Sequence, residues 1–314
     1  PELYADLPEK GFTPFLDSLM RNGLTFKRMY ANGSRSIQAM PSVLGSIPSF
    51  RTPFVLMPQS LGESRQLPAM LADKGYATAF FCGSERGSMG FGAYARSAGV
   101  ERLVSREDYE AKHGTRDFDG YWGIWDEPFM QYYCTKMGEM KQPFMTAIFT
   151  VSSHHPFVIP KEYKTVYKEE GLPIHKCIRY TDHAIGRFFA SASKQPWFKN
   201  TIFVLTSDHT NQTDHPEYQS AIGGFSAPII IYDPSGEIRP GMRPATVAQQ
   251  IDILPTIFGQ LGYDKRYLSF GCDLLHTPAQ DTYAVNYVDG IYQYAKYGYV
   301  LQFDGQRVRG VYAL

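Results

Sequence analysis

Short apolar runs alternate with helical patterns along this chain, and this alternation constrains the fold most strongly. The runs are rich in β-branched and aromatic residues and cover residues 78–82, 144–152, 201–208 and 227–232. Apolar residues at three- and four-residue spacing predict helices over residues 14–21, 67–74, 127–140, 176–194 and 247–261. Such alternation predicts an α/β fold in which a mostly parallel central sheet is sandwiched by helices.

The end of the chain has a different sequence pattern. Tyrosine-rich runs at 282–287 and 296–303 are separated by glycine-containing turns, a pattern typical of antiparallel strands. We therefore expect one α/β domain, large enough to hold a catalytic site, over residues 1–279. A small antiparallel subdomain over residues 280–314 should pack on its sheet. No repeat or polar linker suggests a further division.

Charge and hydropathy exclude several classes of protein. The 314 residues contain 31 Lys and Arg against 31 Asp and Glu, so bulk charge disfavours nucleic-acid binding. No apolar run approaches the roughly 18 residues that a membrane span requires. The sequence begins at Pro1, without an initiator methionine, which leads us to expect a piece of a longer protein.

The most informative local feature is an apolar run that leads directly into Asp208 and His209. Ligands collect at the carboxyl ends of parallel strands, where this pair supplies an oxygen and a nitrogen ligand for a divalent metal. The alternative is structural, with Asp208 capping the next turn and His209 packing beside it. The polar loop that follows contains a second imidazole, His215, and favours the functional interpretation.

Two further segments hold candidate residues. His154 and His155 follow the run at 144–152, so at least one imidazole should lie at the same edge, able to bind or protonate a substrate oxygen. The turn that contains Arg35 and Ser36 precedes a helix-compatible stretch, where backbone N–H groups favour a phosphate or another oxyanion. Arg35 could add positive charge there. A serine in this position is also a common helix cap, and that alternative stays open.

Seven motifs together resemble the lipoteichoic acid synthase-like branch of the alkaline phosphatase and sulfatase superfamily, whose best-known members are phosphoglycerol transferases. They follow in the family's order: T-P-F-L at 13–16, N-G-S-R-S at 32–36, W-G-I-W-D at 122–126, S-H-H-P-F at 153–157, S-D-H at 207–209, Q-I-D-I-L-P-T at 250–256 and S-F-G at 269–271.

The resemblance implies a role for each matching residue. Ser36 is the expected nucleophile of a covalent phospho-enzyme and a metal ligand, and Asp208 and His209 are the metal-ligand pair. The implied cofactor is one divalent ion, manganese, magnesium or zinc. His154 is expected to hold the substrate or protonate the leaving group.

Other candidates are expected at the substrate. Arg35 and His215 are placed there, and Trp122 is expected either to line a substrate groove or to pack in the core. The acid at position 252 is interpreted as a helix-stabilising or buried hydrogen-bonding group and not as a ligand.

Three departures from the family's pattern matter. The metal-binding glutamate that ends the family's first strand would precede Pro1, so that strand and ligand are expected upstream. Residues 83–91 lack the closely spaced Trp and Arg of the glycerol-phosphate pocket, which leaves the head group open. Ser36 is not followed by the Pro or Arg of a formylglycine sulfatase pattern, which disfavours sulfate-ester hydrolysis.

The expected activity is metal-dependent transfer of a phosphoglycerol-type head group from a membrane phospholipid to a glycerol-phosphate or glycan acceptor. The alternatives are a phosphodiester or sulfate-ester hydrolase and a metal-free binding module. By resemblance, the domain is expected on the extracytoplasmic face of a bacterial membrane, anchored by helices outside this sequence.

Overall fold

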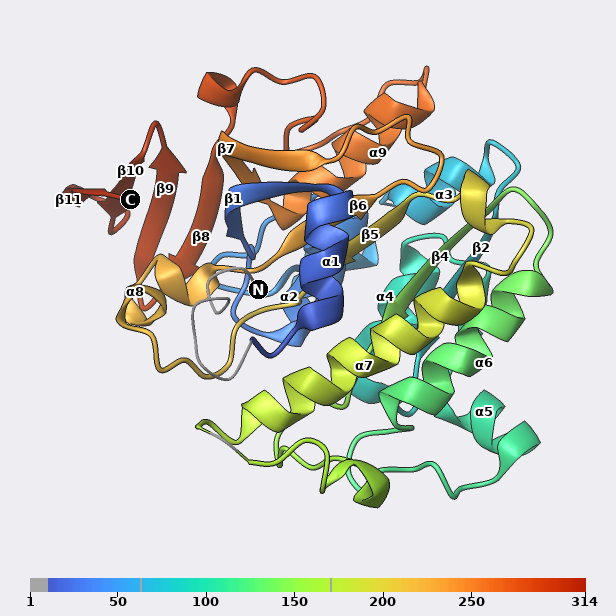
Figure 1. The fold of residues 1–314 in the computed structure, drawn as a ribbon. Coiled ribbons are helices and arrows are strands. Elements are labelled where there is room, and N and C mark those ends of the chain that lie inside the picture. The colour runs from blue at the N-terminus through green and yellow to red at the C-terminus, as the bar shows by residue number, and fades with distance from the viewer. Residues whose placement is uncertain (1–10, 63, 170) are drawn as a thin grey trace.

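The central layer of the molecule consists of two hydrogen-bonded sections. The computed structural model describes residues 11–62, 64–169 and 171–314 (Figure 1). The strands of the layer are β1 (Leu24–Tyr30), β2 (Ala77–Cys82), β3 (Arg102–Val104), β4 (Phe144–Phe149), β5 (Phe203–Thr206), β6 (Ile229–Tyr232) and β7 (Gly241–Gln249). One section has the order β5-β6-β1-β7, and the other has the order β3-β2-β4.

Strand direction agrees with the predicted mostly parallel sheet, with one exception. β1 is parallel to β7, and β2 is parallel to both β3 and β4. β6 is antiparallel to both of its neighbours, β1 and β5, which makes the layer mixed. The four apolar runs predicted as strands form β2, β4, β5 and β6.

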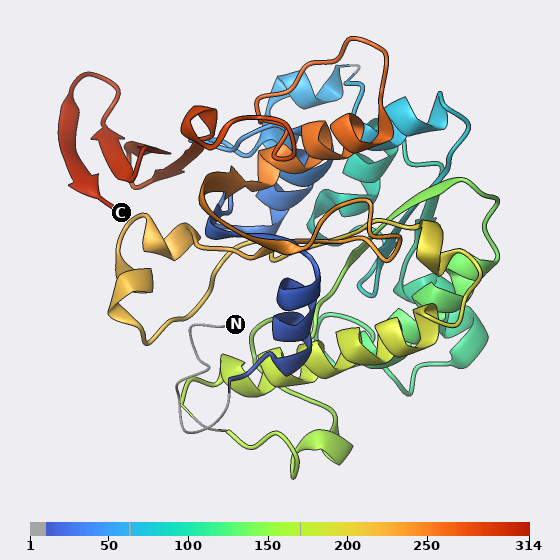
Figure 2. The ribbon, with the colours of Figure 1, turned by 45° about the horizontal axis from the view of Figure 1, so that its top comes forward.

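Helices cover both faces of this layer. The α-helices are α1 (Pro14–Asn22), α2 (Ser36–Gly45), α3 (Leu67–Ala72), α4 (Phe91–Ser97), α5 (Arg106–His113), α6 (Asp126–Gly138), α7 (Ile174–Ala192), α8 (Pro216–Gln219) and α9 (Ile253–Leu261). Figure 2 shows α3 and α9 on one side of the strands and α6 and α7 on the other. In the part of the chain that the structure describes, no helix is both long and apolar enough to cross a bilayer.

The burial of β2 explains why helices are needed on both sides. Ala79 and Phe81 pack in the cluster with α6 and α7, whereas Phe80 and Cys82 pack in the cluster with α3, α4 and α9. Because successive side chains of a strand point to opposite faces, a fully apolar strand is stable only when both faces are covered. The predicted α/β class is therefore confirmed.

Two predictions of local structure were wrong. Residues 247–249 were assigned to a helix but form the end of β7, and α9 begins only at Ile253, after a 3-10 turn at Gln250–Asp252. β1 was not predicted, because Lys27 and Arg28 interrupt its apolar pattern. β1 lies between β6 and β7, and β7 pairs with β1, so strand pairing outweighs local propensity at both places.

A separate antiparallel sheet forms the end of the chain. It has the order β11-β10-β9-β8, with β8 (Ala284–Val288), β9 (Ile291–Lys296), β10 (Tyr299–Phe303) and β11 (Val308–Ala313). It lies to one side of the central layer in both views (Figures 1 and 2). Ala284, Ala295 and Val300 form a buried cluster with Tyr30 and Val247 of the central strands. Of the predicted 1–279 domain, residues 1–10 lie outside the described residues.

Candidate active site

The first part of the site is the turn between β1 and α2. The Gln38 side chain accepts hydrogen bonds from the backbone N–H groups of Ser34 at 2.9 Å and Arg35 at 3.0 Å. A Cβ on Gly33 would lie 2.5 Å from Gln38 Cβ, so the turn requires glycine at this position. These bonds fix Ser36 as the first residue of the ten-residue helix α2, where the helix dipole favours an anion.

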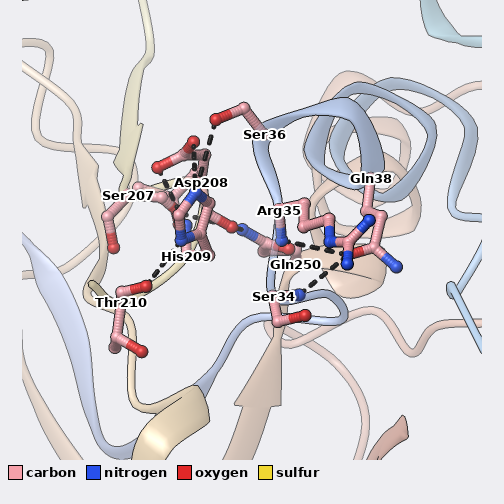
Figure 3. Close-up of polar contacts among 10 residues, drawn as sticks. Ser34, Arg35, Ser36, Gln38, Ser207, Asp208, His209, Thr210 and Gln250 are labelled. Carbon is pink, nitrogen blue, oxygen red and sulfur yellow. Dashed lines mark hydrogen bonds and ion pairs between the residues drawn. The ribbon is translucent and has the colours of Figure 1, made fainter. Parts of the chain in front are cut away.

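Ser36, Asp208 and His209 meet at this turn. Ser36 Oγ lies 3.3 Å from His209 Nε2, and the same nitrogen lies 3.3 Å from Asp208 Oδ2 (Figure 3). Asp208 also accepts the backbone N–H of His209 at 2.9 Å. The sequence places Ser36 173 residues from His209, and the fold brings them together because β1 and β5 lie in the same section of the sheet.

The protonation of His209 follows from its other nitrogen. His209 Nδ1 lies 2.5 Å from the Thr210 carbonyl oxygen, which can only accept, so Nδ1 carries the proton. Nε2 then presents a lone pair to the Ser36 hydroxyl and to the Asp208 carboxylate. An imidazole held in this way by a backbone carbonyl is the usual form of a metal-binding histidine.

The donor set therefore fits a divalent cation. Two electron-pair donors, His209 Nε2 and Asp208 Oδ2, face each other at 3.3 Å, and a cation between them would remove their repulsion. The Ser36 hydroxyl supplies a third oxygen nearby. Within residues 11–62, 64–169 and 171–314, no group of three or more His, Cys, Asp or Glu side chains forms a complete metal cage.

Two buried amides join the halves of this site, and the sequence did not reveal their role. Gln250 Nε2 donates to the carbonyl oxygens of Ser207 at 2.8 Å and Asp208 at 2.9 Å, and its Oε1 accepts the Asn32 N–H at 3.0 Å. Asn32 Oδ1 in turn accepts the Ile251 N–H at 3.0 Å. Asn32 and Gln250 are both 0% exposed. Both residues lie inside the motifs at 32–36 and 250–256. Membership of these motifs was the only sequence feature that could have pointed to them.

His154 belongs to a neighbouring loop, after β4. Its ring centroid lies 4.0 Å from that of Trp122, and its Nδ1 lies 2.9 Å from the His155 carbonyl oxygen. Trp122 Nε1 donates to the same carbonyl at 2.6 Å. No hydrogen bond joins His154 to Ser36, Asp208 or His209 among the described residues. His155 is exposed, and His154 is half-buried.

Among the described residues, no hydrogen bond joins Arg35 or His215 to Ser36, Asp208 or His209. Arg35 is exposed, and in Figure 3 its side chain lies beside Gln38, away from His209. His215 is half-buried and immediately precedes α8, with its ring centroid 6.3 Å from that of Tyr218. The structure thus groups Ser36, Asp208 and His209 and leaves Arg35 and His215 outside that group.

The interpretation of Asp252 as a buried hydrogen-bonding acid agrees with its contacts. Its carboxylate accepts the N–H groups of Gln249 at 2.9 Å and Cys272 at 2.7 Å. Asp252 is 0% exposed, and burial raises the pKa of its carboxyl well above the usual range. It holds the 3-10 turn that carries Gln250 and has no contact with His209.

The fold and this serine-centred site define the class of protein. The chain superimposes on a protein of the alkaline phosphatase superfamily from Vibrio parahaemolyticus with a TM-score of 0.84 and 25% identity, over 96% of this chain and 76% of that one. The profile of the sulfatase family matches residues 2–263. The chain therefore belongs to the sulfatase family, which is a family of enzymes.

Two curated relatives confirm the branch that the motifs indicated. The chain is 22% identical to the lipoteichoic acid synthase-like protein YvgJ of Bacillus subtilis, over 85% of this chain and 46% of that protein. It is 26% identical to phosphoglycerol transferase I of Citrobacter koseri, over 63% of this chain and 28% of that protein. The chain spans less than half the length of these relatives.

Proposed function

We propose that this chain is the catalytic part of a metal-dependent phosphoryl-group transferase. It would move a phosphoglycerol-type head group from a membrane phospholipid, through a covalent intermediate on Ser36, to a glycerol-phosphate or glycan acceptor. The relatives named as lipoteichoic acid synthase-like and phosphoglycerol transferase support this choice of reaction. We place the reaction on the extracytoplasmic face of a bacterial membrane, in a protein anchored by segments outside this sequence.

The observation that carries the proposal is the contact between Ser36 Oγ and His209 Nε2 at 3.3 Å. Ser36 is 8% exposed and begins α2, so its hydroxyl lies at the positive end of the helix dipole. A phosphoryl group in that position meets a nucleophile and an anion-binding helix end at the same time. A serine with only a capping role would not require the Asp208–His209 pair beside it.

The first step forms one bond and breaks one bond. The Ser36 hydroxyl would release its proton to water, and its oxygen attacks the phosphorus of the lipid. The bond from phosphorus to the diacylglycerol oxygen breaks as that oxygen takes a proton, which we assign to His154 as the donor. Asp208, His209 and Ser36 would hold the divalent cation, manganese, magnesium or zinc. When bound, such a cation lowers the pKa of a nearby hydroxyl and neutralises charge on the phosphoryl oxygens.

The second step reverses the first with a different oxygen. An acceptor hydroxyl attacks the phosphorus of the Ser36 adduct and loses its proton to His154, and the Ser36 oxygen leaves. Because the lipid product departs before the acceptor enters, one pocket can serve both substrates. We place Arg35 and His215 near the phosphate and the acceptor.

The test is product analysis with phosphatidylglycerol and Mn²⁺. We expect release of diacylglycerol and loss of at least about 1,000-fold of this activity in Ser36→Ala, as for other covalent nucleophiles. Ser34→Ala is the matched control, because Ser34 precedes the helix and is exposed. Equal activity in Ser36→Ala and the unmodified chain would remove Ser36 from the mechanism.

The same experiment separates the alternative activities. Transfer of glycerol phosphate to an added acceptor supports the transferase, whereas release of free glycerol phosphate alone would indicate a phosphodiester hydrolase. Turnover of a sulfate ester and not of the lipid would indicate sulfate-ester hydrolysis. Absence of any turnover or metal binding would leave a metal-free binding module.

A further inference from the structure

The segment 119–126 crosses the edge of the three-stranded section, from the end of β2 to the loop after β4. At β2, the Ile124 N–H donates to the Gly83 carbonyl oxygen at 2.9 Å. A Cβ on Gly123 would lie 2.4 Å from that oxygen, so only glycine permits this approach. Asp119 Oδ1 accepts three successive backbone N–H groups, those of Tyr121, Trp122 and Gly123.

At β4, the same segment is attached through Asp126. Its Oδ1 accepts the N–H groups of Val151 at 2.9 Å and Ser152 at 3.1 Å, and its own N–H donates to Ser152 Oγ at 2.9 Å. Its Oδ2 accepts the hydroxyl of Thr181 on α7 at 2.8 Å, and Thr181 also contacts Ser153 Oγ at 3.0 Å. Asp126 is 2% exposed, so these bonds are shielded from water.

The residue that follows this attachment is His154. Trp122, four residues before Asp126 in the same segment, bonds to the His155 carbonyl and lies against the His154 ring. One segment therefore fixes the loop before His154 through Asp126 and the ring of His154 through Trp122. Neither side chain bonds to Ser36, Asp208 or His209, so any effect on the reaction must pass through His154.

We propose that Trp122 and Asp126 are positioning residues that hold the His154 imidazole at the sheet edge for proton transfer. This inference rests on the proposed function for its kinetic part and deepens it. Trp122, expected either to line a substrate groove or to pack in the core, packs partly buried against the cluster of α3, α4 and α9 and contacts His154. A general acid acts only within hydrogen-bond reach of its target, so a small displacement of the loop slows the chemical step and leaves lipid binding nearly unchanged.

The test combines kinetics with the NMR signals of His154 in the full chain, assigned by their loss in His154→Ala. We expect Asp126→Asn to lower kcat by about 100-fold, because a misplaced catalytic group costs about that much, with KM for phosphatidylglycerol changed less than about threefold. Trp122→Phe, which removes the N–H that bonds to His155 and reduces the ring surface against His154, should lower kcat by about tenfold. In both variants the His154 ring-proton shifts should move toward those of an unstacked histidine.

Asp182→Asn is the matched control. Asp182 is 3% exposed, and it also accepts two backbone N–H groups, those of Phe15 and Leu16 at the start of α1. It should lose comparable thermal stability and leave both kcat and the His154 signals unchanged. If Asp126→Asn does not fold, Thr181→Val removes the bonds of the Thr181 hydroxyl to Asp126 and Ser153 and should show the same pattern with a smaller effect.

The decisive comparison is the double variant. If Asp126 acts through His154, Asp126→Asn should lower activity less than about threefold when His154→Ala is already present. An equal loss in both backgrounds, or unchanged His154 signals in Asp126→Asn, would overturn the proposal. If the unmodified chain shows no Ser36-dependent turnover, the proposed function fails, and the NMR comparison still decides whether this segment positions His154.

Discussion

The two sides of the site are held in place by different chemistry. On the Ser36 side, the amides of Asn32 and Gln250 bridge segments 218 residues apart, and both are fully buried. On the His154 side, the carboxylate of Asp126 and the indole of Trp122 hold one loop. The first side joins strands of the four-stranded section, and the second covers the edge of the three-stranded section.

The difference has an electrostatic consequence. An amide can brace the Asp208 loop without adding charge next to the proposed cation and phosphate, whereas a carboxylate there would compete for that cation. Asp126 carries its charge on the loop before His154, where it meets two N–H groups and a hydroxyl. We therefore expect metal binding to depend on the Ser36 side and the position of His154 on the other. Both sides contribute to stability and to its pH dependence, since burial also raises the pKa of the Asp252 carboxyl that holds the Gln250 turn.

The largest expected effect is on metal affinity. Asp208→Asn replaces a charged ligand by a neutral one and should weaken Mn²⁺ binding by at least about 1,000-fold, more than the 10- to 100-fold typical of residues that only orient a ligand. Asp214→Asn, in the same loop, is the control. Calorimetry decides, and unchanged affinity in Asp208→Asn would relocate the metal site.

The next effect tests the buried amide. Gln250→Leu leaves the carbonyls of Ser207 and Asp208 and the N–H of Asn32 without a partner, which should cost about 3 kcal/mol of unfolding free energy. Urea denaturation measures this. Gln260→Leu on α9, whose single bond to Glu237 is exposed, should cost less than about 0.5 kcal/mol. Equal costs for the two substitutions would show that Gln250 does not hold the Ser36 side in place.

The smallest effect concerns pH. Burial raises the pKa of the Asp126 carboxyl in the folded chain above its unfolded value of about 3.9, so the folded state binds more protons. The contribution of this group to stability is therefore greatest below that value and declines as pH rises through the raised pKa, by at most about 1.4 kcal/mol per pH unit. The destabilisation caused by Asp126→Asn should accordingly shrink as pH rises from 4, when both chains are unfolded in urea. A growing destabilisation would contradict this assignment.

The sequence predicted those features that depend on neighbouring residues. Ser36, Asp208 and His209 were found because polar residues directly follow apolar strand patterns or precede a helix. The strands β1 and β7 were missed because Lys27, Arg28 and Pro244 break their patterns, and their pairing in the four-stranded section fixes them. The bridge made by Gln250 depends on the register of that section, which local periodicity does not encode.

The segment around Asp126 shows the same limit. Its motif was visible in the sequence, but nothing in the spacing indicated that a helix-start acid reaches the loop after β4. That contact depends on how far β2 and β4 extend, since both strands end beside the segment. Prediction from the sequence therefore reached the residues to which we assign the reaction and stopped before the residues that hold them.

The most direct test of the central claim is intact mass and peptide mapping of the full chain after incubation with Mn²⁺ and phosphatidylglycerol without an acceptor. The account predicts one glycerol-phosphate adduct on Ser36, absent in Ser36→Ala and discharged when an acceptor is added. Release of diacylglycerol with no adduct on Ser36, or an adduct on another residue, would contradict it.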